Sequence, residues 1–169
     1  MDNDTKMKWA IIYVTRSGNC KKLAEELANQ TNGDVYEIID LVDRSGLGGF
    51  LKGGAQATWG ELTSIQSPEI DYNAYTTVIL VMPMWAFTIC PPMKTFLSLH
   101  RENLLKLQIG LVISHLGTST KKMVANFQKD FGIVKASTSI KEKISSQDKT
   151  ALLASFIQDM EMNGIEGKS

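Results

Sequence analysis

Hydrophobic residues fall into short runs that alternate with helical patterns along the chain. Trp9–Val14, Thr77–Met82 and Leu107–Ser114 contain almost no polar residues. Such runs are typical of strands that are covered on both faces of a sheet. Asp34–Leu41 shows more polar alternation, so we expect this second strand nearer an edge, and Ile133–Ile140 is a weaker fifth strand.

Proline and glycine mark where these elements begin and end. Pro83 is expected to close the third strand, because proline lacks the N–H that a central strand needs. Pro91 and Pro92 suit the first turn of a helix, and Gly132 suits the position after the last turn of another. The expected helices carry apolar residues at helical spacing and lie at Leu23–Ala28, Pro91–His100, Thr118–Gly132 and Ser146–Met160.

One segment fits neither pattern. Ser45–Gly60 contains six glycines and receives no firm assignment, although a short helix around Phe50–Thr58 is compatible with its residues. The rest of the chain repeats a strand followed by a helix, which predicts an α/β sandwich with a mainly parallel sheet. The length of 169 residues fits a single domain, residues 1–169.

Composition excludes several functional classes. The chain has 18 Lys+Arg and 18 Asp+Glu, which gives no support to nucleic-acid binding or to a strongly acidic docking protein. The 2 cysteines are too few for a disulfide framework, and the 2 histidines do not predict a metal site. No apolar run is long enough for a membrane span, and Met1–Lys8 is polar. We therefore expect a soluble, cytoplasmic protein that binds no membrane.

The first candidate site is the loop T-R-S-G-N-C, Thr15–Cys20, between a buried strand and a helix. Helix N-termini attract anions through unpaired N–H groups and the helix dipole. The loop is neither a Walker A motif nor G-x-G-x-x-G, so a single terminal phosphate fits it best. A capped helix that binds nothing is the alternative. The dipole would also lower the thiol pKa of Cys20, which could then be reactive, but a small residue packed beside the loop is the favoured interpretation.

The second candidate is P-M-W-A-F-T-I-C-P-P, Pro83–Pro92, directly after the third strand. Trp85 and Phe87 could form a flat apolar wall for a planar ring, or both rings could pack beneath the loop. Their position favours the first interpretation, because ligands of open α/β sheets lie beyond the carboxyl ends of the strands.

The third candidate is S-H-L-G-T-S-T, Ser114–Thr120, after the fourth strand. His115 could bind a ligand heteroatom or transfer a proton, or it could be structural. No carboxylate lies close to it in sequence and no G-x-S-x-G motif is present, so a hydrolase triad has no local support. We name no catalytic residue and no metal ligand.

Together these motifs resemble the flavodoxin-like flavoprotein family. T-R-S-G-N-C is similar to its phosphate loop, [ST]-x-[ST]-G-N-T, and the Pro83 segment is similar to the one beside its isoalloxazine ring; the resemblance runs from Trp9 to about Met160. It implies a three-layer sandwich with a five-stranded parallel sheet in the order 2-1-3-4-5, and FMN at the edge of the first and third strands. The residues that would bind FMN are Thr15, Arg16, Ser17, Gly18, Asn19 and Cys20 at the phosphate, Pro83, Met84, Trp85, Ala86 and Phe87 along the ring, and His115, Leu116 and Gly117 on its far side.

Two departures from the family pattern qualify this expectation. Cys20 replaces a threonine, and the loss of a hydroxyl donor would weaken phosphate binding by about 1 kcal/mol. The glycine-rich stretch Gly46–Gly60 is unlike the compact second flavin loop of many small flavodoxins.

The resemblance implies an FMN-binding flavoprotein that acts in electron transfer or as an oxidoreductase, with a redox protein or a small-molecule electron acceptor as its partner. An NAD(P)H-dependent quinone or FMN reductase is the first alternative, and a flavin-free binding module of the same fold is the second. Small electron-carrier flavodoxins are typically acidic, which steers them to basic partners. The balanced charge of this chain therefore favours a small-molecule partner. The sequence does not determine the oligomeric state.

Overall fold

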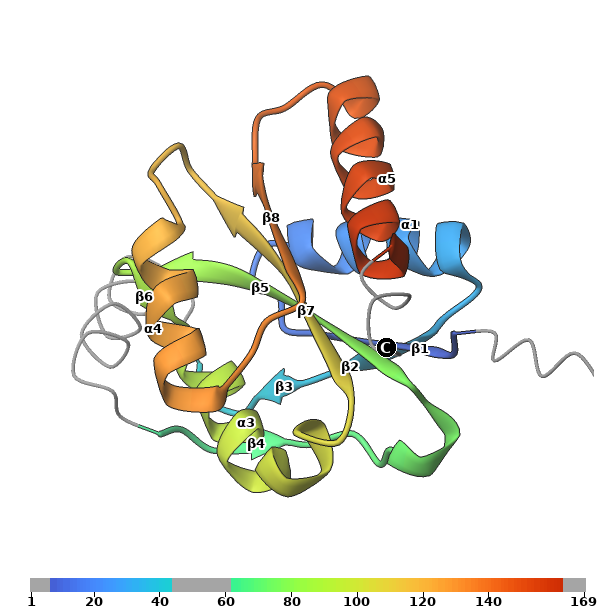
Figure 1. The fold of residues 1–169 in the computed structure, drawn as a ribbon. Helices are drawn as coiled ribbons and strands as arrows, with labels where there is room; N and C mark the ends of the chain where they lie inside the picture. The colour runs from blue at the N-terminus through green and yellow to red at the C-terminus, as the bar shows by residue number, and fades with distance from the viewer. Residues whose placement is uncertain (1–6, 44–61, 163–169) are drawn as a thin grey trace, which may run out of the picture.

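Five parallel strands form the centre of the molecule (Figure 1). The computed structural model describes residues 7–43 and 62–162. The sheet has the order β2-β1-β5-β7-β8, which confirms the expected order 2-1-3-4-5. Its strands are β1 (Trp9–Tyr13), β2 (Asp34–Glu37), β5 (Thr77–Trp85), β7 (Gln108–His115) and β8 (Ala136–Lys141).

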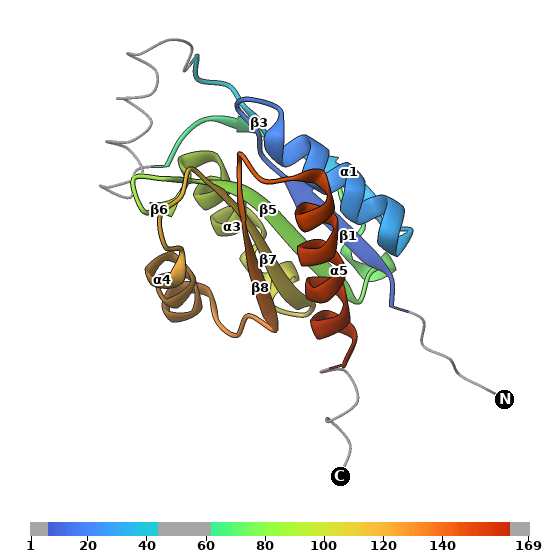
Figure 2. The ribbon, with the colours of Figure 1, turned by 90° about the horizontal axis from the view of Figure 1, so that it is seen from above.

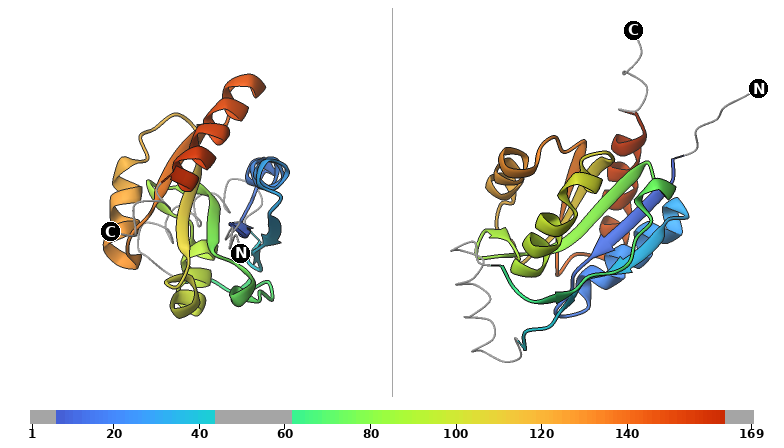
Figure 3. Two further views of the ribbon diagram at one scale, coloured as in Figure 1. Left: turned by 45° about the vertical axis from the view of Figure 1, so that its right-hand side comes forward. Right: turned by 90° about the horizontal axis from the view of Figure 1, so that it is seen from below.

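Helices cover both faces of this sheet and make a sandwich of three layers (Figure 2). The views in Figure 3 agree that α1 (Asn19–Thr31) and α5 (Ser146–Met162) lie on one face, and α3 (Pro91–Leu104) and α4 (Lys121–Phe131) on the other. Each face has its own apolar core, one including Leu27 and Phe156 and the other Phe96 and Phe127. Because β1 is covered on both faces, all five of its residues are buried, as the unbroken apolar run predicts.

Proline and glycine mark the helix ends largely as expected. Pro91 and Pro92 occupy the first positions of α3, and Gly132 follows the last residue of α4. The N–H of Gly132 donates to the carbonyl of Gln128, which closes the last turn. However, α3 runs to Leu104, one turn beyond the expected end near His100.

The expected end of the third strand at Pro83 is wrong. β5 continues to Trp85 and then turns back into β6 (Thr88–Ile89), which pairs with it antiparallel. The carbonyl of Val81 points toward β1, where it accepts from the N–H of Val14. Pro83, two residues further along β5, has its backbone nitrogen on the same side, but the pairing with β1 has already ended there. The missing N–H of Pro83 therefore breaks no ladder, and Pro83 still pairs in register with Ser114 of β7.

Two further strand expectations need correction. Asp34–Leu41 is not one strand: Ile38 turns into the core and donates its N–H to Tyr13, which separates β2 from β3 (Ile39–Asp40). β2 is an edge strand, as expected, whereas β3 pairs antiparallel with β4 (Ile65–Gln66) in a small second sheet. The fifth strand, β8, begins at Ala136 and not at Ile133 as expected. The Ile133 side chain is 88% exposed and so lies outside the sheet.

A short 3-10 helix, η1 (Tyr72–Ala74), leads into β5. The suggested helix at Phe50–Thr58 lies outside the described residues. Within the two described stretches of chain, no helix is both long enough and apolar enough to cross a membrane.

Candidate functional site

The three predicted loops meet around one cleft of about 410 Å³ beyond the carboxyl ends of β1, β5 and β7. Its volume lies in the range of small-molecule sites. Gly18, Ala86, Phe87 and Gly117 belong to these loops but do not line the cleft. The residues that do are Thr15, Arg16, Ser17, Asn19, Cys20, Pro83, Met84, Trp85, Ser114, His115, Leu116 and Glu142.

The loop between β1 and α1 forms the polar end of the cleft. Gly18 has φ 87°, a left-handed conformation that a side chain would strain, and its N–H donates to Thr15 Oγ1 at 3.0 Å. Gly18 is also the N-cap of α1, so no side chain caps the helix. The first turn contains no acidic residue. The N–H groups that an N-cap side chain would otherwise satisfy are therefore not capped by this helix's own side chains, and Asn19 of the first turn lines the cleft.

Cys20 does not have the lowered thiol pKa that the helix dipole predicts. Its side chain is 2% exposed and packs in the core beneath α1. Burial is the main cause that raises the thiol pKa, with smaller contributions from Cys90 and Glu142, and a hydrogen bond with Ser114 offsets only part of this effect. Desolvation thus outweighs the helix dipole, and Cys20 is a packed thiol rather than a reactive one.

The hairpin of β5 and β6 supplies the apolar wall of the cleft. Met84 and Trp85 are half-buried and line it. Ala86 and Phe87 form the two-residue turn, with φ values of 46° and 62°. This turn carries the Phe87 side chain out to 63% exposure. The sequence placed Trp85 and Phe87 together in one wall, but in the structure only Trp85 lies in it.

The loop after β7 forms the opposite wall with His115 and Leu116. The N–H of Gly117 donates to Nδ1 of His115 at 3.0 Å. This bond makes Nδ1 an acceptor, so in the neutral ring the proton is on Nε2, which can donate a hydrogen bond. Leu116 is 74% exposed and adds apolar surface at the mouth.

Glu142 lines the cleft and was missed by the sequence analysis, whereas Ser114 begins the third candidate segment but was not among the residues expected to bind FMN. Ser114 is the last buried residue of β7. Glu142 follows β8, and its N–H donates to the carbonyl of His115 at 2.9 Å. Because β8 pairs with β7, its carboxyl end reaches the cleft as well. The rule that ligands lie beyond strand ends applies equally to this strand, and applying it there would have found Glu142.

A second hollow of about 460 Å³ lies beside the cleft and shares Thr15, Arg16 and Trp85 with it. Its other lining residues are Val14, which follows β1, and residues of β2, β3 and the turns around them. The carboxylates among them are Glu37, Asp40 and Asp43. Among the described residues, no three histidine, cysteine or acidic side chains are arranged to hold a metal ion.

The fold is similar to that of solved flavoprotein structures. A flavoprotein from Lactobacillus acidophilus, solved in complex with FMN, has a TM-score of 0.67 at 22% identity and covers 86% of this chain and 99% of its own. A candidate flavoprotein from Bacteroides eggerthii has a TM-score of 0.71 at 17% identity, with 89% and 98% covered. A flavodoxin from the domain Archaea has a TM-score of 0.55 at 14% identity, with 92% and 99% covered.

The chain therefore has the flavodoxin-like fold. Comparison of the sequence with protein-family models gives no match, and neither does comparison with curated proteins.

Proposed function

We propose that the protein binds FMN in the cleft between β1, β5 and β7 and acts in electron transfer or as an oxidoreductase. One observation carries the proposal: a single cleft joins an uncapped helix N-terminus at one end to an apolar, aromatic wall at the other. FMN has the matching shape, with a terminal phosphate and a planar apolar ring. A flavoprotein of the same fold has been solved with FMN bound.

The residues at the polar end fit a phosphate. Ser17 and Asn19 lie beside the first turn of α1, where backbone N–H groups and the helix dipole favour an anion. Arg16 adds a positive charge on the same loop. Gly18 lets the backbone turn tightly enough for the loop to surround the phosphate. These residues would hold FMN by its phosphate, whatever redox state the ring has.

The residues at the other end fit the ring. Met84 and Trp85 would cover one side of it, and Leu116 the other, which excludes water from the ring. His115 would donate from Nε2 to a ring heteroatom or to a bound substrate. Glu142 places a negative charge at the cleft and would disfavour added electrons on the ring. When bound, FMN supplies the redox chemistry, and these side chains tune it.

A small-molecule partner is favoured over a protein partner. The chain carries equal numbers of positive and negative side chains, so it lacks the strong overall charge that steers a carrier to an oppositely charged protein. Direct reduction by NAD(P)H, as in a quinone or FMN reductase, is the matching second candidate. Cys20 and Cys90 are both buried and form no disulfide with each other, which supports a reducing compartment and hence the cytoplasm.

Spectroscopy of the purified protein tests the proposal. We expect the visible absorbance of an oxidised flavin and the release of FMN on denaturation. Bleaching by NADPH without a partner reductase would favour the reductase over the carrier. A colourless protein that takes up no added FMN would overturn both, and would leave a flavin-free binding module.

Substitution of Ser17 tests the position of the phosphate. Ser17→Asp puts a carboxylate at the loop, and a like charge at about 4 Å costs ~1–4 kcal/mol, so the FMN dissociation constant should rise at least about fivefold. Ser98→Asp on the exposed side of α3 makes the same change away from the cleft and should leave FMN affinity unchanged. Equal affinities of the two variants would refute the placement of the phosphate at this loop.

A further inference from the structure

The first turn of α1 carries charges of the sign that a helix N-terminus disfavours. Lys21 and Lys22 stand in this turn, and it contains no acidic residue. A cation at a helix N-terminus opposes the macrodipole, at a cost of ~0.3–1 kcal/mol each. Local choices that oppose a general rule are concentrated at functional sites. An anion bound between the lysines and the helix end would interact favourably with both, and would turn this unfavourable arrangement into a favourable one.

A pocket of about 170 Å³ lies at this place, between α1, β8 and α5. Three lysines from three different elements line it: Lys22 from α1, Lys141 from β8 and Lys149 from α5. Glu142 is the only acidic side chain among its lining residues, so the positive charge there exceeds the negative. Asn19, Ser114 and Glu142 line both this pocket and the proposed flavin cleft, which makes the two spaces neighbours.

Two of the three lysines have no carboxylate partner. In the described part of the chain, neither Lys22 nor Lys141 forms an ion pair, whereas Lys149 pairs with Glu26 at 3.2 Å. The Lys141 side chain lies beside the loop after β7, since a Cβ added at Gly117 would lie 3.5 Å from its Cε and 3.9 Å from its Nζ. The two lysines without an ion pair therefore come from two different walls of the pocket, Lys22 from α1 and Lys141 from β8.

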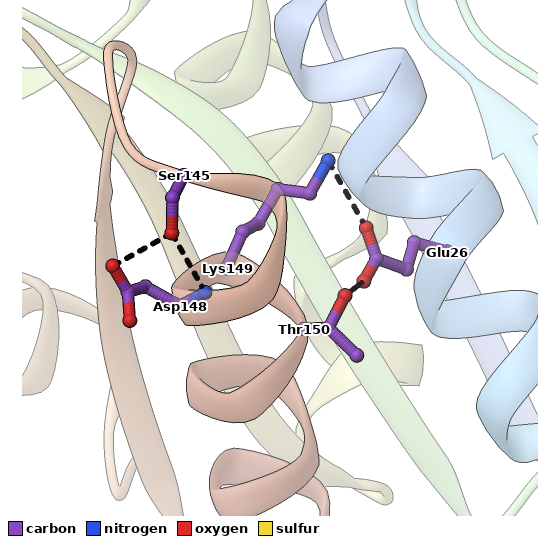
Figure 4. A network of polar contacts seen from close by, with 5 residues as sticks. All are labelled: Glu26, Ser145, Asp148, Lys149 and Thr150. Carbon is purple, nitrogen blue, oxygen red and sulfur yellow. Dashed lines mark hydrogen bonds and ion pairs between the residues drawn. The ribbon is translucent and has the colours of Figure 1, made fainter.

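The third wall of the pocket is held in place by contacts between α1 and α5 (Figure 4). Lys149 and Thr150 both reach Glu26 of α1, and the Thr150 hydroxyl donates to it at 2.6 Å. At the start of α5, Ser145 accepts from the N–H of Asp148 at 3.1 Å and caps the helix. These contacts fix the distance between the helices and so the width of the pocket.

We propose that this pocket is a second anion site, which binds a phosphate group separate from the one assigned to the Thr15–Cys20 loop. Lysines bind phosphates as point charges, and those of this pocket surround a space that a phosphate group can enter. The phosphate could belong to a nucleotide that extends from the cleft or to a separate phosphorylated molecule. This proposal is argued from the lysines that line the pocket, so it does not depend on FMN binding in the cleft.

Binding of inorganic pyrophosphate to the FMN-saturated protein tests the proposal, because FMN then occupies the other loop. We expect saturable binding by calorimetry and a rise in melting temperature. Lys22→Gln with Lys141→Gln should weaken pyrophosphate binding at least about tenfold, since two charges beside the anion are lost. Lys121→Gln with Lys122→Gln, in the first turn of α4, removes the same charge outside the pocket and should leave binding unchanged.

Nucleotides then distinguish the two sources of the phosphate. If the nucleotide extends from the cleft, NADPH should bind more tightly than NADH, and the Lys22/Lys141 variant should lose this difference. If pyrophosphate binds but the two nucleotides bind alike, the phosphate comes from a separate molecule. Absence of pyrophosphate binding, or equal weakening in both double variants, would overturn the site. If the chain takes up no FMN, pyrophosphate binding is measured in the Ser17→Asp variant, whose carboxylate disfavours an anion at the Thr15–Cys20 loop. A Lys22/Lys141 dependence that persists in this variant would keep the second site and refute only the proposed function.

Discussion

His100 shows how burial at a single residue makes stability depend on pH. Its ring stacks on Phe96 with centroids 4.4 Å apart, lies 5.6 Å from the ring of Tyr72, and places Nε2 2.7 Å from Ser67 Oγ. These contacts remove water from the imidazole, and this desolvation lowers the pKa of His100 below its ordinary value. The protonated ring is therefore less stable in the folded protein than in the unfolded chain.

The expected result is a loss of stability in mild acid. The folded pKa of His100 is the lower one, so the unfolded chain takes up the proton first as pH falls below about 6.5. The contribution of His100 is complete above that value and is lost as pH falls through the folded pKa. Urea unfolding at several pH values should show this loss in the wild type and a smaller one in His100→Gln. Identical pH dependence of the two proteins would contradict the assignment.

At the scale of elements, the turn between β5 and β6 is the clearest conflict between sequence and structure. Two-residue hairpins favour turns with positive φ at both positions, which Asn-Gly adopts easily. This chain has Ala86 and Phe87 there, at φ 46° and 62°. Left-handed backbone costs side-chain-bearing residues ~1–2 kcal/mol each. Such strain persists only where surrounding structure holds it, and here it lies beside Trp85 of the cleft.

Replacing the turn should therefore stabilise the protein. Ala86→Asn with Phe87→Gly keeps the hairpin and relieves the strain, which should raise the free energy of unfolding by ~1–2 kcal/mol in urea titrations. Phe87→Ser removes the same exposed ring but keeps a side chain at positive φ, so it serves as the matched control. If Phe87→Ser stabilises as much as the double variant, the exposed ring and not the backbone is the source of the effect.

Elements that carry a local sequence signal could be predicted, whereas the β5–β6 hairpin could not. β1 and α3 follow from local signals, because an unbroken apolar run and the pair Pro91–Pro92 determine them without reference to the rest of the chain. The β5–β6 hairpin carries no such signal, since Ala-Phe is not a turn dipeptide and Pro83 argues against a strand. Pro83 is tolerated only because β1 ends earlier, a tertiary fact that no local pattern contains.

At the scale of the whole molecule, strand order brings the site together. The loops after β1, β5 and β7 were recognised from their own residues, and the parallel sheet places them at one edge. Glu142 has no motif around it and reaches the cleft only because β8 lies next to β7. Cys20 packs beside the loop, which was the favoured interpretation, and its thiol pKa depends on this core packing rather than on its place in a helix.

The net charge of the whole molecule does not show how its charged side chains are distributed. The balance of 18 basic and 18 acidic side chains argues against a large net field. Even so, Lys21 and Lys22 lie in the first turn of α1, and Lys121 and Lys122 begin α4, with no acidic residue in either first turn. Both helices begin at the carboxyl edge of the sheet, where ligands bind in this class of fold. Net charge therefore limits long-range steering but does not exclude a local anion site.

The arrangement of two cores on one sheet predicts how core substitutions combine. Ile11 and Ile79 face each other in register within one core, whereas Ile113 points into the other core, two strands away from Ile11. All three side chains are fully buried, so each Ile→Val change should cost ~0.5–1.5 kcal/mol. Distant sites add to within ~0.3–0.5 kcal/mol, while residues in contact share the space left by a lost methyl group and do not.

We therefore expect Ile11→Val with Ile113→Val to destabilise by the sum of the single changes, and Ile11→Val with Ile79→Val to depart from it. Both pairs remove the same atoms, so the first is the matched control for the second. Urea unfolding should show one transition for every variant, because the sheet joins both cores into one cooperative unit. If Ile11→Val and Ile113→Val are coupled as strongly as Ile11→Val and Ile79→Val, the two cores are not independent of each other. A second unfolding transition would show that they do not unfold as one unit.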